Sequence, residues 1–155
     1  MAKVKLGEFE VTLNGDLPSV GSQLPDFLLA DGDLKNVSLE QFKGKKLVLN
    51  IFPSMSTPVC SAAAVKFNAL ASQFKDTVIL CISRDLGFSH KQFCLNHNIN
   101  DVIFLSDMRN EDFANEYGVL HTNGKFQGLL ARSVLVADSD HKIIYSQLVD
   151  QTGHE

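Results

Sequence analysis

Cys60 has the surroundings that turn a cysteine into a nucleophile. Thr57 is a good helix N-cap and Pro58 falls at the first helical position, so this register makes Cys60 the third residue of a helix. There the sulfur would face unpaired backbone N–H groups and the positive end of the helix dipole, which lowers the pKa of a thiol. The alternative is a small, buried, apolar residue, as most free cysteines are. Cap, proline and cysteine together favour a reactive thiol.

The other two cysteines have different surroundings. Cys81 lies inside the apolar run VILCI, which predicts a residue of the core. Cys94 lies among polar and charged neighbours in FSHKQFCLNHN, a predicted helix over 88–98 with Ser89 as its cap. A disulfide between Cys60 and Cys94 requires Cα atoms within about 7 Å, a distance that the sequence does not give.

Two further groups could take part in chemistry. His90, Cys94 and His97 share one helical face, which is compatible with a metal site, although one helix rarely supplies a whole site and a solvated face is the alternative. Arg132 leads into the predicted strand 133–137. Near Cys60 it could stabilise a thiolate and donate to a bound oxygen, and otherwise it is an exposed charge at a strand end.

A strand and a helix position Cys60. The apolar run 47–52 predicts a buried strand, and Pro53 ends it because proline cannot donate to a sheet ladder. The following helix has an apolar stripe, made of Ala63, Phe67, Leu70 and Phe74. This stripe would pack the helix on the sheet, with Cys60 near the carboxyl end of the strand, where ligands bind in open α/β sheets.

The remaining segments complete an α/β pattern. We expect an N-terminal β-hairpin over 4–13, strands at 27–30, 77–83, 102–105, 133–137 and 143–148, a brief helix after Ser38, and a helix over 111–117 closed by Gly118. The last two strands should form an antiparallel hairpin. The sheet is therefore predicted to be mixed, parallel in the middle and antiparallel at one side. A thioredoxin-like fold requires this pattern, although periodicity does not single that fold out.

Length and composition exclude several classes of protein. The 155 residues, with a net charge of −4, predict a single domain over 1–155 and show no basic stripe for nucleic acid. Its apolar runs are too short for a bilayer, and MAKVKLGEFEV lacks the apolar region of a signal peptide. The three cysteines form no C-x-x-C, which disfavours a disulfide scaffold, a zinc ribbon and a thioredoxin-type reductase. No phosphate loop or dinucleotide fingerprint is present, and a cytosolic protein that uses cysteine chemistry fits best.

The chain resembles the bacterial thiol peroxidases, which are atypical two-cysteine peroxiredoxins. Pro53, Thr57 and Cys60 are similar to the motif around the peroxide-reactive cysteine of peroxiredoxins. The matching segments extend from about residue 27 to residue 150 and include VLNIFPS, VCSAAAVKFN, VILCISRDL, FC at 93–94, LSDMRN, YGV, GLLARSVLVAD and SQLVD.

This resemblance implies a fold, a reaction and a role for each matching residue. The fold would be a thioredoxin fold with an N-terminal β-hairpin, in a cytoplasmic bacterial homodimer without cofactor or metal. Cys60 would react with hydrogen peroxide or an organic hydroperoxide, and Cys94 would resolve the product to a disulfide that thioredoxin reduces. Thr57 would hydrogen-bond the thiolate and the peroxide, Pro53 would shield the sulfur from water, and Arg132 would complete the pocket.

The chain departs from the family pattern in several segments. Arg84 stands where a small residue is usual, and Gly87 interrupts the usual DLPF. Residues 95–98 (LNHN) replace a glycine-rich stretch after Cys94, which bears on the mobility that resolution requires. Met55, Ser56 and Pro58 also differ from the usual motif, and we expect that the C-terminal helix of the relatives is absent here.

Other functions remain open on the residues alone. A peroxide sensor would oxidise at Cys60 but pass the oxidation to a partner protein, and a binding module would use all three cysteines for packing. For the peroxidase, Phe52, Met55, Phe88 and Phe93 could form an apolar collar that favours organic peroxides. Both cysteine-bearing helices would have to unwind locally upon oxidation, because cysteines on separate helices are not expected within bonding distance in the reduced protein.

Overall fold

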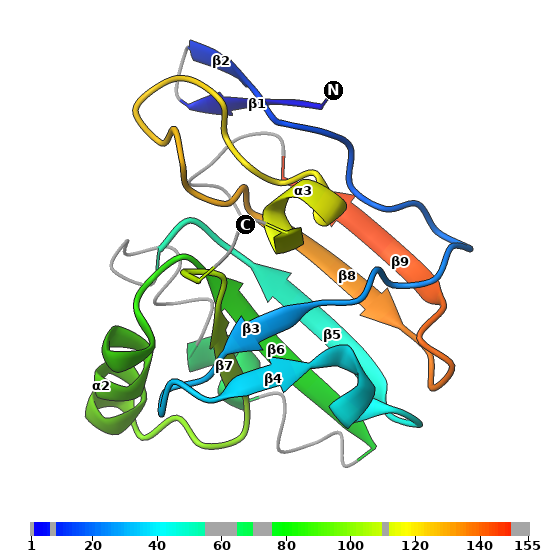
Figure 1. Ribbon diagram of the computed structural model, residues 1–155, viewed down its shortest axis with the longest axis vertical. Coiled ribbons are helices and arrows are strands. Elements are labelled where there is room, and N and C mark those ends of the chain that lie inside the picture. Colours follow the sequence, from blue (N-terminus) through cyan, green and yellow to red (C-terminus); the bar gives the residue numbers. More distant parts are fainter. Residues whose placement is uncertain (1, 7–8, 55–64, 70–75, 110–111, 150–155) are drawn as a thin grey trace.

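The computed structural model describes residues 2–6, 9–54, 65–69, 76–109 and 112–149. Its main element is a seven-stranded sheet with the order β4-β3-β7-β6-β5-β8-β9 (Figure 1). A separate antiparallel hairpin, made of β1 (Lys3–Leu6) and β2 (Phe9–Thr12), lies at the top of this view. None of the helices in the described part of the chain is both long and apolar enough to cross a membrane.

The predicted centre of the sheet is confirmed. The central strands β5 (Lys46–Ile51), β6 (Thr77–Ser83) and β7 (Ile103–Ser106) run parallel. On one side, β8 (Ser133–Ala137) and β9 (Ile143–Leu148) are antiparallel, as expected from their short connection. The sheet is also antiparallel at the opposite side, which was not expected: there β3 (Leu28–Ala30) pairs with β4 (Asn36–Ser38) and β7.

The short β4 was missed because its sequence, NVS, carries a single apolar residue. A turn of 3-10 helix, η1 (Leu39–Phe42), follows it where a brief helix after Ser38 was expected. The backbone N–H of Ser38 donates to Gln41 Oε1 at 2.8 Å, so the side chain of Gln41 helps to close this turn.

Two described α-helices flank the sheet. The helix α2 (Gly87–His97) agrees with the expected 88–98 in position, but its N-cap is Leu86, so the assignment of Ser89 as cap was wrong. The shorter α3 (Asp112–Tyr117) is followed by Gly118 at φ 66°, the left-handed conformation that glycine adopts after helices. In the predicted helix that begins at Thr57, residues 65–69 are helical, and 57–64 and 70–74 lie outside the described residues.

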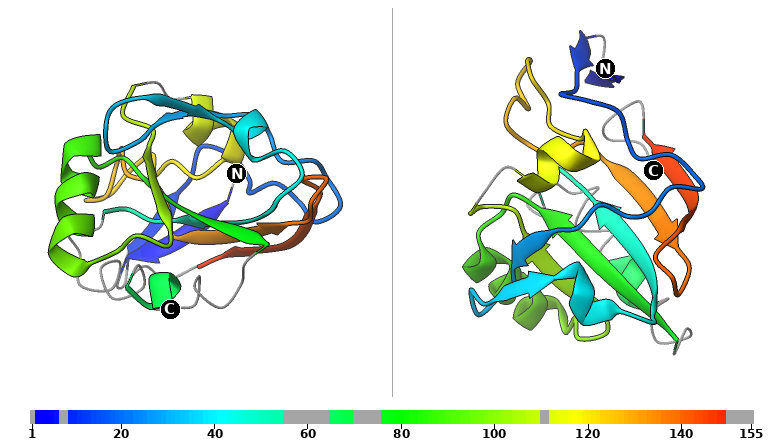
Figure 2. Two further views of the ribbon diagram at one scale, coloured as in Figure 1. Left: turned by 90° about the horizontal axis from the view of Figure 1, so that it is seen from below. Right: turned by 45° about the vertical axis from the view of Figure 1, so that its right-hand side comes forward.

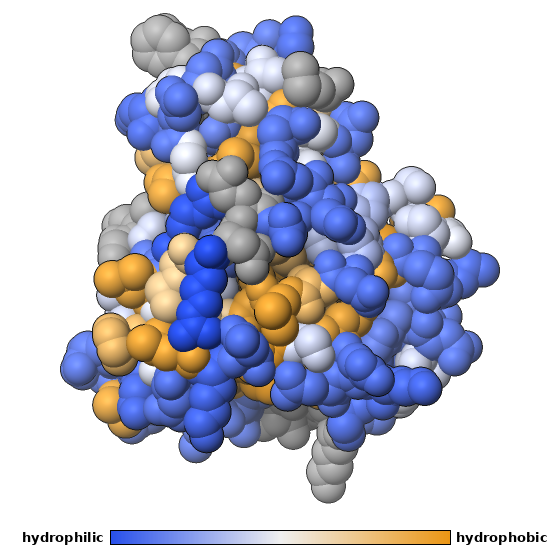
Figure 3. Space-filling model, in the orientation of Figure 1, coloured by the Kyte–Doolittle hydropathy of each residue, from blue (hydrophilic) through white to orange (hydrophobic). Residues whose placement is uncertain are grey.

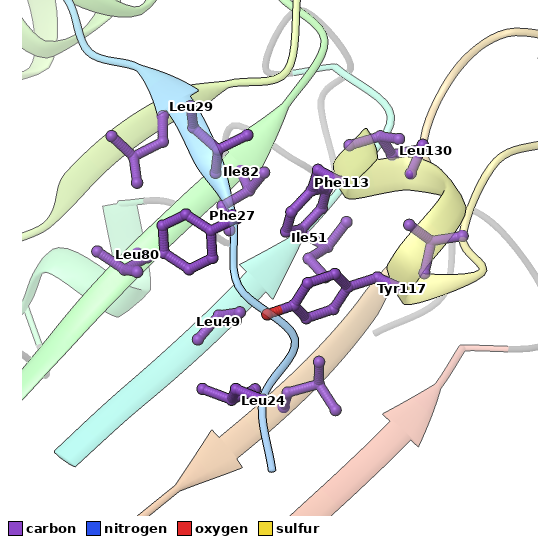
Figure 4. Packing of buried hydrophobic residues seen from close by; sticks show 14 of the residues in the cluster. Leu24, Phe27, Leu29, Leu49, Ile51, Leu80, Ile82, Phe113, Tyr117 and Leu130 are labelled. Carbon is purple, nitrogen blue, oxygen red and sulfur yellow. The ribbon is translucent and has the colours of Figure 1, made fainter. Parts of the chain in front are cut away.

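Alternation along the central strands divides the core between two faces of the sheet. We call the first the packing face. It carries Leu47, Leu49 and Ile51 of β5, together with Leu80 and Ile82 of β6 and Leu105 of β7. Figure 4 shows Phe113 and Tyr117 of α3 lying over this face, and Tyr117 Oη donates to the carbonyl of Pro25 at 2.7 Å.

The opposite face of the sheet, which we call the site face, has a smaller cluster. Its buried members are Phe52, Ile79, Cys81, Phe93, Ile99, Val102 and Phe104, with Val48, Phe67 and Cys94 packed against them. In the left view of Figure 2, the helical piece at 65–69 and α3 lie on opposite sides of the sheet. Phe67 of the helical piece at 65–69 and Cys94 of α2 therefore pack on the same side.

Candidate active site

The carboxyl ends of β5 and β6 form the edge of the sheet from which the Cys60 segment leaves. After Ile51 the chain continues through Phe52 and Pro53, which are both buried. The backbone N–H of Phe52 donates to the carbonyl of Ile82 at 3.0 Å, so the chain stays beside β6 until the proline. Because proline has no N–H to donate, the ladder ends there and the chain can leave the sheet.

Arg132 lies at this same edge. The antiparallel register of β5 and β8 places Ser133 opposite Ile51, so the preceding Arg132 comes beside the residues that follow β5. Only 5% of Arg132 is exposed, and the alternative of an exposed charge at a strand end is therefore wrong. A buried guanidinium at the point where the Cys60 segment begins can supply positive charge to that segment.

Cys60, Thr57 and Pro58 themselves lie outside the described residues, so their predicted geometry remains a prediction. The helical piece at 65–69 supports the expected course of the chain. Phe67, a member of the predicted apolar stripe, packs against the cluster on the site face. On the predicted helix, Cys60 is expected about two turns before Phe67.

Cys81 is a core residue, as predicted. Its side chain is fully buried in β6, and burial raises the pKa of its thiol to about 12. The amide of Asn50 approaches its sulfur at 3.8 Å, which is a weak contact. At neutral pH Cys81 is therefore a protonated thiol without access to solvent, and it is unsuited to act as a nucleophile.

Cys94 is half-buried in α2. Burial raises the pKa of its thiol, so near neutral pH Cys94 is mainly protonated. The residue also borders a surface pocket of about 280 Å³, together with Lys91, Leu95, Asn98, Ile99 and Asn100. Cys94 thus combines low intrinsic reactivity with access from solvent.

Three large apolar side chains are exposed at α2 and directly before it. Leu86, Phe88 and Leu95 expose 57%, 65% and 66% of their areas. In Figure 3 apolar atoms gather at the lower left, where Figure 1 places α2. The predicted collar is divided by this arrangement, since Phe88 points to solvent while Phe52 and Phe93 are buried on the site face. Met55 lies outside the described residues.

A polar cluster joins the ends of β5 and β6 to α2. Ser54 Oγ donates to Asp85 Oδ1 at 2.7 Å, and Ser83 Oγ donates to Asp85 Oδ2 at 2.6 Å. His90 Nε2 lies 2.8 Å from Ser83 Oγ and 3.8 Å from Asp85 Oδ2. We call Ser54, Ser83, Asp85 and His90 the Asp85 cluster.

The solvated-face interpretation of His90, Cys94 and His97 is wrong for His90, which is fully buried. His97 is exposed, and its ring stacks on Phe93 at 4.2 Å. Within the described residues, no three His, Cys, Asp or Glu side chains gather in a way that could hold a metal ion. Although His90 and His97 share one helical face, they therefore lie in different environments.

Arg84, a departure from the family pattern, ties the ends of two strands together. Its Nε and Nη2 donate to the two oxygens of Asp107 at 3.1 and 2.9 Å, and its Nη1 donates to the carbonyl of Gly128 at 2.8 Å. The Asp107 side chain is fully buried. These contacts connect the end of β6 to the end of β7 and to the loop that contains Gly128.

Sequence reasoning missed the Asp85 cluster. Its members come from the ends of two strands and from a helix, and only the fold brings them together. One local signal was available, because Ser83, Asp85 and His90 occur within eight residues at a predicted strand–helix junction. Polar residues at the carboxyl end of a parallel strand are expected to face the functional edge of the sheet.

Comparison with known proteins gives consistent matches over nearly the whole chain. The family model "Redoxin" matches residues 19–155. A thiol peroxidase of Corynebacterium glutamicum is 42% identical over 155 residues, covering 100% of this chain and 93% of that protein. A thiol peroxidase of Vibrio cholerae is 44% identical over 146 residues, covering 94% of this chain and 88% of that protein.

Solved structures agree with these sequence matches. A peroxiredoxin-like protein from Aquifex aeolicus superposes with a TM-score of 0.94 at 34% identity, covering 100% of this chain and 90% of that chain. A thiol peroxidase from Chromobacterium violaceum has a TM-score of 0.90 at 23% identity, covering 98% of this chain and 88% of that chain. The second likeness concerns the fold alone.

Proposed function

Since this chain belongs to the Redoxin family, has the thioredoxin-like fold of peroxiredoxins and is a thiol-dependent peroxidase, we propose that Cys60 reacts with the peroxide and Cys94 resolves the product. The observation that carries this proposal is that Phe67, seven residues after Cys60 in the sequence, and Cys94 pack against one cluster on the site face. Cys81, the third cysteine, is fully buried and unsuited to either role.

In the first step the Cys60 thiolate attacks the terminal oxygen of the hydroperoxide and the O–O bond breaks. The alcohol, or water from hydrogen peroxide, leaves after taking a proton, and Cys60 becomes a sulfenic acid. Thr57 would orient the peroxide, the buried Arg132 would stabilise the charge that moves onto the leaving oxygen, and Pro53 would exclude water.

In the second step the Cys94 sulfur attacks the Cys60 sulfenic acid. The new S–S bond forms, the S–OH bond breaks, and the hydroxyl leaves as water with the Cys94 proton. The raised pKa of Cys94 suits this role, because a protonated thiol does not compete with Cys60 for peroxide.

In the third step a dithiol protein reduces the disulfide by exchange. We propose thioredoxin as this reductant, acting on a homodimer in the bacterial cytoplasm. Two features support docking beside Cys94, namely the pocket that it borders and the exposed apolar side chains of Leu86, Phe88 and Leu95. A reductant thiolate must approach the sulfur directly, and an apolar rim is a suitable surface for a protein partner.

The test is the mass of the reduced protein after one equivalent of cumene hydroperoxide, before any reductant is added. We expect the loss of two hydrogens and a peptide pair that links Cys60 to Cys94. C94S should instead carry one added oxygen at Cys60, trapped by dimedone, and C81S should behave like the natural protein.

Two outcomes would contradict the proposal. Oxygen on Cys60 of the natural protein without a link would remove Cys94 as the resolving residue and favour a sensor that passes oxidation to a partner. An unchanged mass would show that Cys60 does not react with the peroxide.

A further inference from the structure

The carboxylate of Asp85 joins the two segments that carry the reacting cysteines. Ser54, which donates to Oδ1, begins the connection from β5 toward Cys60. Ser83, which donates to Oδ2, ends β6, and Asp85 itself lies two residues before α2, the helix of Cys94. One oxygen of the carboxylate thus accepts a hydroxyl hydrogen from the connection after β5 and the other from the end of β6. Hydrogen bonds to a charged carboxylate are stronger than those between neutral groups.

His90 extends this cluster into α2. Ser83 has a single hydroxyl hydrogen, which goes to Asp85, so its oxygen accepts from His90 Nε2–H at 2.8 Å. A neutral His90 ring therefore carries its hydrogen on Nε2. The ring packs edge-on against Phe104 of β7 at 5.2 Å, and His90 lies one helical turn before Cys94.

The hydrogen bonds of the His90 ring are incomplete. Among the described residues, nothing bonds to its buried Nδ1, which holds a lone pair in this tautomer. Movement of α2 into water would satisfy that nitrogen. Of the hydrogen bonds described for this ring, the one that favours the packed position of α2 is therefore on the Nε2 side, through Ser83 to Asp85.

We propose that Asp85 and His90 are positioning residues of the disulfide-forming step, which hold the first turn of α2 against the ends of β5 and β6 and whose release lets Cys94 reach Cys60. This inference rests on the roles proposed for the two cysteines. Asp85 and His90 touch neither the peroxide nor the reacting sulfurs in this scheme. They set how often α2 opens.

Protonation of His90 would favour the open position. Burial lowers the pKa of His90 to about 4, against the attraction of the Asp85 carboxylate. The other groups shown against the ring are uncharged, namely Ser83 at the end of β6 and Phe104 on β7. On α2 itself the neighbouring Lys91 is exposed and directs its ammonium to Asp33 at 2.8 Å.

The direction of the pH effect on opening follows from the surroundings of the His90 ring in the closed and the open position of α2. In the open helix the ring is in water and recovers its ordinary pKa of about 6.5, so opening takes up a proton below that pH. The opening equilibrium should therefore rise as the pH falls from about 6.5 toward 4. Between pH 7.5 and 5.5 the expected increase is about tenfold.

The experiment is amide hydrogen exchange over 87–98 in the fully reduced protein at pH 7.5 and 5.5, with chemical exchange rates corrected for pH. His90→Gln keeps a donor toward Ser83 but cannot be protonated. We expect protection in the natural protein to fall about tenfold more than in H90Q over this interval. His97→Gln makes the same change at an exposed position of α2 and should behave like the natural protein.

A kinetic measurement connects opening to chemistry. After rapid oxidation of Cys60, the rate of disulfide formation is followed at both pH values in the natural protein and H90Q. The rate of the natural protein divided by the rate of H90Q should rise about tenfold from pH 7.5 to pH 5.5. Asp85→Asn, which loses one acceptor, should form the disulfide several-fold faster than the natural protein at pH 7.5.

The results separate this inference from the proposed function. Equal pH dependence of exchange in the natural protein and H90Q would overturn the inference, as would altered exchange without any change in the rate of disulfide formation. Failure of Cys60 to oxidise would overturn the proposed function instead. Because exchange is measured without peroxide, it tests whether Asp85 and His90 restrain α2 even if Cys60 does not react.

Discussion

The two faces of the central sheet differ in kind although the same strands build both. On the packing face, adjacent strands contribute aliphatic side chains that α3 covers with Phe113 and Tyr117 (Figure 4). On the site face, the same strands contribute Asn50 and Cys81, and the covering helix contributes Cys94. One face holds the sheet together, and the other carries groups that can react or titrate.

This difference shows how a small domain separates stability from chemistry. Aliphatic burial contributes about 25 cal/mol per Å² and needs no partner, so the packing face can supply most of the stability. Each buried polar group on the other face must find a partner or accept a cost. The fold can therefore tolerate a cluster such as that of Asp85 and His90 because the opposite face does not depend on it.

The largest expected effect compares Cys60 with Cys81 of the site face. Cys60→Ser should lower the second-order rate with cumene hydroperoxide by a factor on the order of 10³ or more, because a serine hydroxyl is not ionised near neutral pH. Cys81→Ser should keep the rate, since Cys81 is fully buried. Stopped-flow kinetics measures both variants, and a C81S rate as low as that of C60S would contradict the assignment.

C81S should still affect the fold. A hydroxyl placed in this apolar strand interior costs about 1 kcal/mol of unfolding free energy, which urea unfolding can measure. An unchanged rate together with a slightly lower stability would show that Cys81 contributes to packing and not to the reaction.

The next prediction compares neighbouring residues of β5 that point to opposite faces. Leu49→Ala on the packing face should lower the free energy of unfolding by about 4 kcal/mol, because Leu49 is fully buried and the substitution leaves a cavity. Val48→Ala on the site face should cost about 1 kcal/mol, since Val48 is only partly buried. Urea unfolding of both variants checks this difference, and equal losses would contradict the separation of the faces.

The sequence predicted the parts of this structure that depend on local pattern. The strands β5, β6 and β8 follow from apolar runs bounded by breakers, and Gly118 closes α3 because its backbone needs a positive φ. The core position of Cys81 follows from the same reasoning. The pairing of β5 with β8, which places Pro53 and Arg132 at one edge, is known from the structure and was not predicted.

Features that depend on long-range contacts could not be predicted from the sequence. The strand β4 has one apolar residue and forms because β3 lies beside it. His90 was placed on a solvated or metal-binding face, since its neighbours are polar, yet Phe104 and Ser83 from separate strands enclose its ring. Helical spacing says which residues share a face, and only the packed fold says what that face meets.

A further expected effect, smaller than that of Leu49→Ala, concerns the stability of the whole fold as the pH falls. The folded-state pKa of His90 is lowered to about 4 from about 6.5, so its contribution is fully present above pH 6.5 and is lost as the pH falls toward 4. At pH 5.5 the loss should be about 1.4 kcal/mol relative to pH 7.5. His121 adds a loss of the same sign, since burial also lowers its pKa.

H90Q isolates the contribution of His90 to this loss of stability, because the carboxylates and His121 are present in both proteins. The measurement is urea unfolding of the reduced natural protein and H90Q at several pH values between 7.5 and 5. The difference between their unfolding free energies should shift by about 1.4 kcal/mol between pH 7.5 and 5.5. A difference in unfolding free energy that does not change with pH would mean that His90 keeps its ordinary pKa in the folded protein. Acid would then destabilise the site face no more than the packing face.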